Sequence, residues 1–181
     1  MLNQKEKDIL IQIARKNLES FFQKKKVSYG EGFSKNLQEH KGAFVTLRKF
    51  NRLRGCMGNI ISDIPLYQNV GYLVLEAAFS DPRFPPLKKA ELPKTKIEIS
   101  VLSRPQKVES WQEIKLGKHG VIVRQEEKSG VFLPQVAIET NWNLETFLSV
   151  LCQEKAGLPS DAWQDKKTDI YIFETEVFAE K

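Results

Sequence analysis

Apolar residues recur along the chain with a helical period in three segments. These segments run from Gln4 to Phe22, from Pro65 to Phe79, and from Asn143 to Gly157. Each has one continuous apolar stripe, which predicts a helix packed on other parts of the protein. A capping asparagine before the third stripe and a glycine followed by proline after it are typical of helix ends.

Short stretches rich in β-branched and aromatic residues lie between the helices and predict strands. Residues 42–60 read as a hairpin with turn character at Phe50-Asn51-Arg52. Residues 96–103 alternate apolar and polar side chains, as in a half-buried antiparallel strand. Further strands are expected at Gly120–Arg124, Val131–Leu133 and Asp169–Phe178. The Leu133-Pro134-Gln135-Val136 stretch is expected to end the pair before it.

The order of these elements lacks the regular βαβ alternation of a parallel sheet, so the fold class is α+β. We expect a compact two-lobed domain with a largely antiparallel sheet and about three main helices. It would occupy residues 1–181 as one domain, either undivided or built as two intertwined lobes.

One segment concentrates the reactive side chains: Arg54-Gly55-Cys56-Met57-Gly58-Asn59. Its thiol lies between two glycines, which permit a bulge or the close approach of a ligand. An arginine two residues away could stabilise a thiolate or bind an anion. The alternative is that Cys56 acts as a small apolar residue filling a tight space beside a bulge.

A second segment, Asp81-Pro82-Arg83-Phe84-Pro85-Pro86-Leu87, is stiffened by three prolines. It presents Asp81 and Arg83 at a low cost in entropy. These two residues either orient a ligand together with Arg54 or form an ion-pair cluster that tethers the segment to the hairpin.

Composition narrows the possible functions. The chain is 41% apolar and 28% charged, with a formal net charge of +5. Its lysine groups have no interleaved aromatic residues, which argues against a nucleic-acid partner. No apolar run is long enough to span a bilayer, and the charged N-terminus does not resemble a signal peptide, so we expect a cytoplasmic protein without a membrane partner.

The few cysteines and histidines argue against a metal centre. Cys56 and Cys152 are far apart in sequence, and with His40 and His119 they form no zinc-binding spacing. We therefore expect two free thiols, no metal and no cofactor. Cys152 lies on the apolar face of the third helix, which indicates core packing. Folding could bring His119 to Cys56 as a base, although a lone histidine is more often structural.

Five segments together resemble the AMMECR family, which in prokaryotes is known as protein A of the AmmeMemoRadiSam system. They occur in the family's order and cover nearly the whole chain: Leu53–Gly58, Asp81–Leu87, Ile97–Leu102, Phe132–Val136 and Lys155–Leu158. Met57 and Asn59 depart from the residues more usual in the family. The resemblance implies a two-lobed α+β fold and an association with a Memo-type protein and a radical S-adenosylmethionine protein, but no particular reaction.

Two main functional hypotheses follow, and a third, less favoured one is nucleic-acid binding through the basic patches. In the first, a cleft between Arg54–Gly58 and Asp81–Leu87 binds a small anionic metabolite; Cys56 attacks or contacts it, while Asp81 orients Arg83 or moves a proton. In the second, the chain is a non-catalytic accessory module whose proline-rich segment binds a partner protein. The candidate residues are Cys56 and Asp81 for catalysis, and Arg54, Gly55, Gly58, Asn59, Arg83 and Gln135 for ligand binding.

Overall fold

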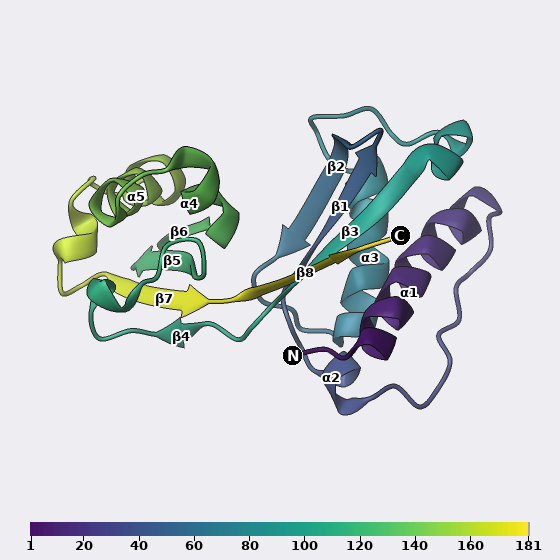
Figure 1. Ribbon diagram of the computed structural model, residues 1–181, viewed down its shortest axis with the longest axis horizontal. Helices are drawn as coiled ribbons and strands as arrows, with labels where there is room; N and C mark the ends of the chain where they lie inside the picture. The colour runs from purple at the N-terminus through teal and green to yellow at the C-terminus, as the bar shows by residue number, and fades with distance from the viewer. Residues whose placement is uncertain (181) are drawn as a thin grey trace. The chain divides into compact units, whose positions relative to one another are not determined.

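The computed structural model describes residues 1–180, and the chain divides into two compact units (Figure 1). Unit 1 comprises Met1–Leu102 together with the residues from Glu176 onward, and unit 2 comprises Ser103–Thr175. Each unit has its own hydrophobic core and its own four-stranded sheet. The antiparallel pairing expected from the sequence is confirmed, and the division of the strands between two sheets was not predicted.

Unit 1 is a sheet with two long helices packed on one of its faces (Figure 1). The strand order is β2-β1-β3-β8, which leaves β2 at an edge. The elements are α1 (Gln4–Phe22), α2 (Lys35–Gln38), β1 (Ala43–Lys49), β2 (Arg52–Asn59), α3 (Leu66–Phe79), the 3-10 helix η1 (Lys89–Lys94), β3 (Thr95–Leu102) and β8 (Thr175–Ala179).

The predicted boundaries of the first helix are confirmed, and its start has a clear cause. Asn3 accepts a hydrogen bond from the backbone of Glu6, whose carboxylate in turn accepts from the backbone of Asn3. This capping box satisfies two amide groups that have no partner inside the helix. The apolar stripe of α1, with Leu10 and Leu18 fully buried, packs against α3 and the sheet.

The predicted hairpin is also confirmed, as an antiparallel pair of β1 and β2 joined through Phe50 and Asn51. Thr46 on β1 lies opposite Cys56 on β2 and opposite Glu98 on β3. The pairing shifts register between Leu47 and Arg48, so β2 has the irregularity that its glycines predicted.

Unit 2 is a smaller sheet, with strand order β4-β7-β5-β6, that packs against short helices. Its elements are β4 (Gln106–Lys107), η2 (Trp111–Glu113), β5 (Gly120–Gln125), β6 (Lys128–Phe132), α4 (Pro134–Thr140), α5 (Leu144–Val150), η3 (Leu151–Ala156), η4 (Ala162–Gln164) and β7 (Asp169–Phe173). The predicted third helix is confirmed as α5 continued by η3; it begins at an Asn143 cap and ends at Gly157, whose φ is +63°.

Two expectations for the second half of the chain were wrong. The segment after β6 does not merely end the strand pair, because Pro134 begins the helix α4. Proline lacks an N–H and has a fixed φ, so it suits a strand end and a first helical turn equally. The last strand is also interrupted at Glu174: β7 belongs to the sheet of unit 2, and β8 joins the sheet of unit 1. No described helix is both long enough and apolar enough to cross a membrane.

Candidate functional site

An ion pair caps the open edge of β2 at Cys56. The Cys56 N–H donates to Asp81 Oδ2 at 2.8 Å, and Arg83 Nη2 donates to the Cys56 carbonyl oxygen at 3.3 Å. Both polar groups of the Cys56 backbone therefore point away from β1. Asp81 supplies the acceptor and Arg83 the donor that a further strand would have supplied, which protects part of an exposed sheet edge.

Asp81 holds Arg83 tightly while being almost completely buried. Its side chain is 2% exposed and accepts from Arg83 Nε at 2.9 Å, from Arg83 Nη2 at 2.8 Å and from the Arg83 N–H at 3.1 Å. The bidentate bond to Arg83 holds the pKa of the Asp81 carboxyl far below its usual range, against the effect of burial. Such a group stays ionised near neutral pH, so the geometry favours orienting Arg83 over moving a proton.

Arg83 itself remains accessible. Its side chain is 57% exposed, its guanidinium lies over the ring of Phe84, and its hydrogen bonds within residues 1–180 use Nε and Nη2. The pKa of Arg83 is raised first by the hydrogen bond to Asp81 and, to a smaller extent, by interactions with the Cys56 side chain. Nη1 is therefore left to face solvent or a ligand.

The Cys56 thiol lies on the sheet face opposite the helices. Its neighbour Gly55 faces α3, and successive residues of a strand point to opposite faces. The thiol is half-buried and accepts a hydrogen bond from Thr46 Oγ1 at 3.2 Å. Arg48, bound to Glu98 through two hydrogen bonds of 3.1 and 3.2 Å, is close enough for its charge to interact with the thiol. Cys56 thus has two guanidinium groups in its surroundings.

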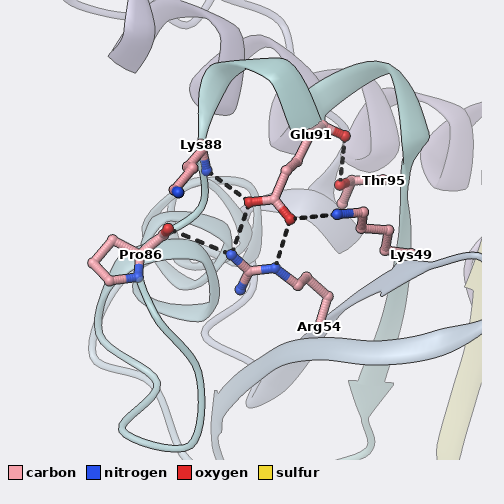
Figure 2. Close-up of polar contacts among 6 residues, drawn as sticks. All are labelled: Lys49, Arg54, Pro86, Lys88, Glu91 and Thr95. Carbon is pink, nitrogen blue, oxygen red and sulfur yellow. Dashed lines mark hydrogen bonds and ion pairs between the residues drawn. The ribbon is translucent and has the colours of Figure 1, made fainter.

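Arg54 is committed to a different partner. Its Nε and Nη2 donate to the carboxylate of Glu91 at 3.1 and 3.0 Å, and Lys49 donates to the same carboxylate at 2.8 Å (Figure 2). Arg54 Nη2 also reaches the carbonyl oxygen of Pro86 at 3.4 Å. The hydrogen bond from Arg54 lowers the pKa of Glu91 far below its usual range. Together these contacts fix η1 and the proline-rich segment to the hairpin.

One nitrogen of that network has no partner. Arg54 Nη1 is buried and makes no hydrogen bond within the described part of the chain. The side chain of Arg54 is only 11% exposed, so it is less accessible to an anion than Arg83. The expected binding roles of the two arginines therefore differ, and Arg83 has the more suitable position.

The two glycines are required by packing inside unit 1. A Cβ on Gly55 would collide with the carbonyl oxygen of Ala77 on α3, and one on Gly58 would collide with the ring of Phe44. The amide of Asn59 exchanges hydrogen bonds of 2.9 and 3.0 Å with that of Asn69. These contacts explain the presence of Gly55, Gly58 and Asn59 without a ligand. A role for the three residues in ligand binding stays a prediction.

Gln135 and His119 belong to unit 2. Gln135 follows Pro134 in the first turn of α4, and its buried Oε1 has no hydrogen-bond partner among residues 1–180. His119 Nδ1 accepts from the Lys115 N–H at 3.2 Å, and burial lowers the pKa of the imidazole. Cys152 is fully buried in the core of unit 2. Within the described residues, no group of three or more His, Cys, Asp or Glu side chains is placed to hold a metal ion.

The sequence reading missed several residues that the site depends on: Thr46, Arg48, Asn69, Glu91 and Glu98. A signal for Thr46, Arg48 and Glu98 was present, because they alternate with buried residues of β1 and β3 and so share the face opposite the helices. The pairing of Glu91 with Arg54 could not be seen, because 37 residues separate them.

Comparison with known proteins identifies the family. The family model AMMECR1 matches residues 11–178, which is most of the chain. The chain belongs to the AMMECR1 family. A protein from Nanoarchaeum equitans is 44% identical, covering 94% of this chain and 98% of its own, and one from Aquifex aeolicus is 39% identical, covering 95% and 91%. The crystal structure of the uncharacterized protein PH0010 from Pyrococcus horikoshii matches with a TM-score of 0.86 at 35% identity, covering 99% of this chain and 94% of that one. The α+β class expected from the sequence is therefore confirmed for this AMMECR1 protein.

Proposed function

We propose that this AMMECR1-family protein binds a small anionic metabolite beside Cys56, on the sheet face of unit 1 opposite α1 and α3. Arg83 provides the charge for the ligand, and Asp81 sets the orientation of Arg83. Cys56 contacts the ligand, or, where the ligand carries a leaving group, its sulfur displaces that group and forms a bond to the ligand carbon. The observation that carries the proposal is a guanidinium fixed by a buried carboxylate, yet more than half exposed, beside a half-buried thiol.

Fixing Arg83 in advance favours binding, because its side chain loses little further freedom when an anion arrives. The carboxylate of Asp81 does not cancel this role, since its hydrogen bonds use Nε and Nη2 and leave Nη1 for a carboxylate or phosphate oxygen. Arg48 adds a second positive charge, although it is shared with Glu98.

The proposal is tested with two alkylating reagents of similar size, anionic iodoacetate and neutral iodoacetamide. The rate for each at Cys56 is measured by peptide mass spectrometry, and the ratio of the two rates reports the local preference for an anion. In the Arg83→Gln variant, the ratio of the iodoacetate rate to the iodoacetamide rate is expected to fall about fivefold. Two opposite charges about 4 Å apart in water attract each other by roughly 1 kcal/mol, and this energy corresponds to that factor.

The neutral reagent controls for any change in the accessibility of Cys56, because a looser loop would accelerate both reactions. The matched control is Arg52→Gln, which removes an exposed arginine from the same hairpin. An equal ratio in the wild type and both variants would show that Arg83 does not direct anions to the thiol, and the proposal would fail.

A second function is favoured by a different observation. Pro82, Pro85 and Pro86 are exposed, while the segment that holds them is fixed at one end by Asp81 and at the other by the contacts of Arg54. We propose as the alternative a preformed surface for a Memo-type or radical S-adenosylmethionine protein. In a pull-down with such a partner, Arg83→Ala would abolish capture and Cys56→Ser would not; equal capture by both variants and the wild type would refute it.

A further inference from the structure

The tip of the β1–β2 hairpin has an aromatic residue in an unfavourable place. Phe50 is 71% exposed, and its φ is +52°, a left-handed conformation that favours glycine and asparagine. The next residue, Asn51, has a φ of +62° and suits such a turn. Neither the solvent nor the backbone favours a phenylalanine at position 50.

A second apolar side chain is exposed beside it. Leu53, at the start of β2, is 39% exposed. Phe50 lies in the two-residue turn and Leu53 lies two residues beyond that turn, so both are at the apolar tip of the hairpin. An exposed apolar group of this kind is a candidate contact with a partner or a membrane.

Positive charge surrounds this tip. Residues 47–54 and 86–96 contain eight lysines and arginines and one acidic residue, Glu91. That carboxylate is already occupied by Arg54 and Lys49, and its hydrogen bonds hold η1 beside the hairpin (Figure 2). Lys94 lies 5.9 Å from the centre of the Phe50 ring.

Five of these basic residues are available to a partner. Arg52, Lys88, Lys89, Lys94 and Lys96 are exposed, and none of the five forms an ion pair within residues 1–180. The excess charge is also unequally distributed. By sequence, unit 1 has 19 lysines and arginines against 12 acidic residues, whereas unit 2 has 9 against 11.

We propose that the hairpin tip and the adjoining η1 dock onto an anionic lipid surface. Phe50 and Leu53 enter the interface between headgroups and acyl chains, and Arg52, Lys88, Lys89 and Lys94 bind lipid phosphates. This peripheral contact needs no spanning helix, so it is compatible with the absence of one among the described residues. It also does not depend on Cys56 or on a bound metabolite.

The observations favour lipid over nucleic acid. Leu53 has no aromatic face on which a base could stack, and one side of the Phe50 ring already has Lys94 near it. Four of the five free basic residues are lysines, whose single charges suit scattered headgroups better than they suit readout of base edges.

The experiment is cosedimentation of the full chain with phosphatidylcholine vesicles, with and without phosphatidylglycerol. Binding is expected only to the anionic vesicles. The Lys88→Gln/Lys89→Gln variant should bind at least tenfold more weakly, given about fivefold for each lysine near an anionic surface. Lys166→Gln/Lys167→Gln removes the same charge from an exposed lysine pair in unit 2 and should leave binding unchanged.

Phe50→Asn separates docking from folding, because asparagine suits the left-handed turn better than phenylalanine does. Its thermal midpoint should equal or exceed that of the wild type, while vesicle binding falls several-fold. Equal losses from the two lysine pairs, full binding by Phe50→Asn, or capture of a single-stranded oligonucleotide without any vesicle binding would each overturn the proposal.

Discussion

Replacing Asp81 with asparagine tests the clamp that holds the proline-rich segment on β2. The carboxylate accepts four hydrogen bonds, three from Arg83 and one from the Cys56 N–H. Asparagine keeps one acceptor oxygen, loses the charge, and brings an NH₂ group against donors. The Asp81→Asn variant should therefore lose both the bidentate pair and the satisfied edge of β2.

The expected loss in the free energy of unfolding depends on how deeply Asp81 and Arg83 are each buried. Breaking a buried ion pair by removing one partner costs about 3–5 kcal/mol, and a hydrogen bond to a charged group contributes about 1.5–3 kcal/mol. Because Arg83 is 57% exposed, water can solvate the released guanidinium, which places the expected cost at about 2–3 kcal/mol. The control is Asp169→Asn, whose partner Lys107 is 55% exposed, because solvent screens a surface ion pair and leaves it little effect on stability.

The assay can distinguish the two units. All three tryptophans lie in unit 2, so their fluorescence reports that unit, whereas α1 and α3 give unit 1 the longest helices and a strong far-ultraviolet circular dichroism signal. Asp81→Asn should lower the denaturant midpoint of the dichroism signal. A midpoint within error of the wild type, or a shift no larger than that of Asp169→Asn, would refute the clamp.

The same variant predicts a pH dependence. The folded pKa of Asp81 is lowered, so its stabilisation is complete above the unfolded value of about 3.9 and is lost as the pH falls below it. The difference in unfolding free energy between the wild type and Asp81→Asn should therefore be largest near neutral pH and shrink in acid. A difference that stays constant into acid would contradict an ion pair as its source.

Three further predictions concern packing, protonation and thiol burial. Gly55→Ala should cost about 2–3 kcal/mol by dichroism, because the added methyl meets the backbone of α3, whereas Gly30→Ala, with open space around it, should be tolerated. His119 has a lowered pKa and accepts from the Lys115 N–H, so tryptophan fluorescence should show unit 2 losing stability as the pH falls below about 6.5, and His119→Asn should lack this loss. Cys152 is buried with a raised pKa, so iodoacetamide should modify it only at the rate of unfolding.

Most helices and strands of this fold could be predicted from local sequence patterns. The start of α1, the hairpin and the Asn143 cap are each encoded within a few neighbouring residues, and all were predicted from them. The helix α4 was missed because proline fits a strand end as well as a first helical turn. The change of sheet at Glu174 was missed because it depends on which strands are available as partners, and hydrogen bonding to a distant strand leaves no local pattern.

In the candidate site, too, the residues could be predicted from local sequence, whereas their distant partners could not. The sequence singled out Arg54, Cys56, Asp81 and Arg83 as candidates. In the structure, Asp81 and Arg83 form an ion pair, and each makes a hydrogen bond to the backbone of Cys56. The sequence could not show that Arg54 forms its ion pair with Glu91 and so is not part of this group. Partner choice among charged side chains depends on tertiary distances that spacing along the chain does not contain.

The most direct test of the proposed site is a crystal structure of the protein alkylated at Cys56 with iodoacetate. The reaction places a carboxylate two bonds beyond the sulfur, where it stands in for an anionic ligand. Our account predicts that this carboxylate lies within hydrogen-bond distance of Arg83 Nη1 while the bond between Asp81 and Arg83 remains intact. A carboxylate directed away from Arg83, or an Arg83 released from Asp81 to reach it, would contradict a preformed anion site.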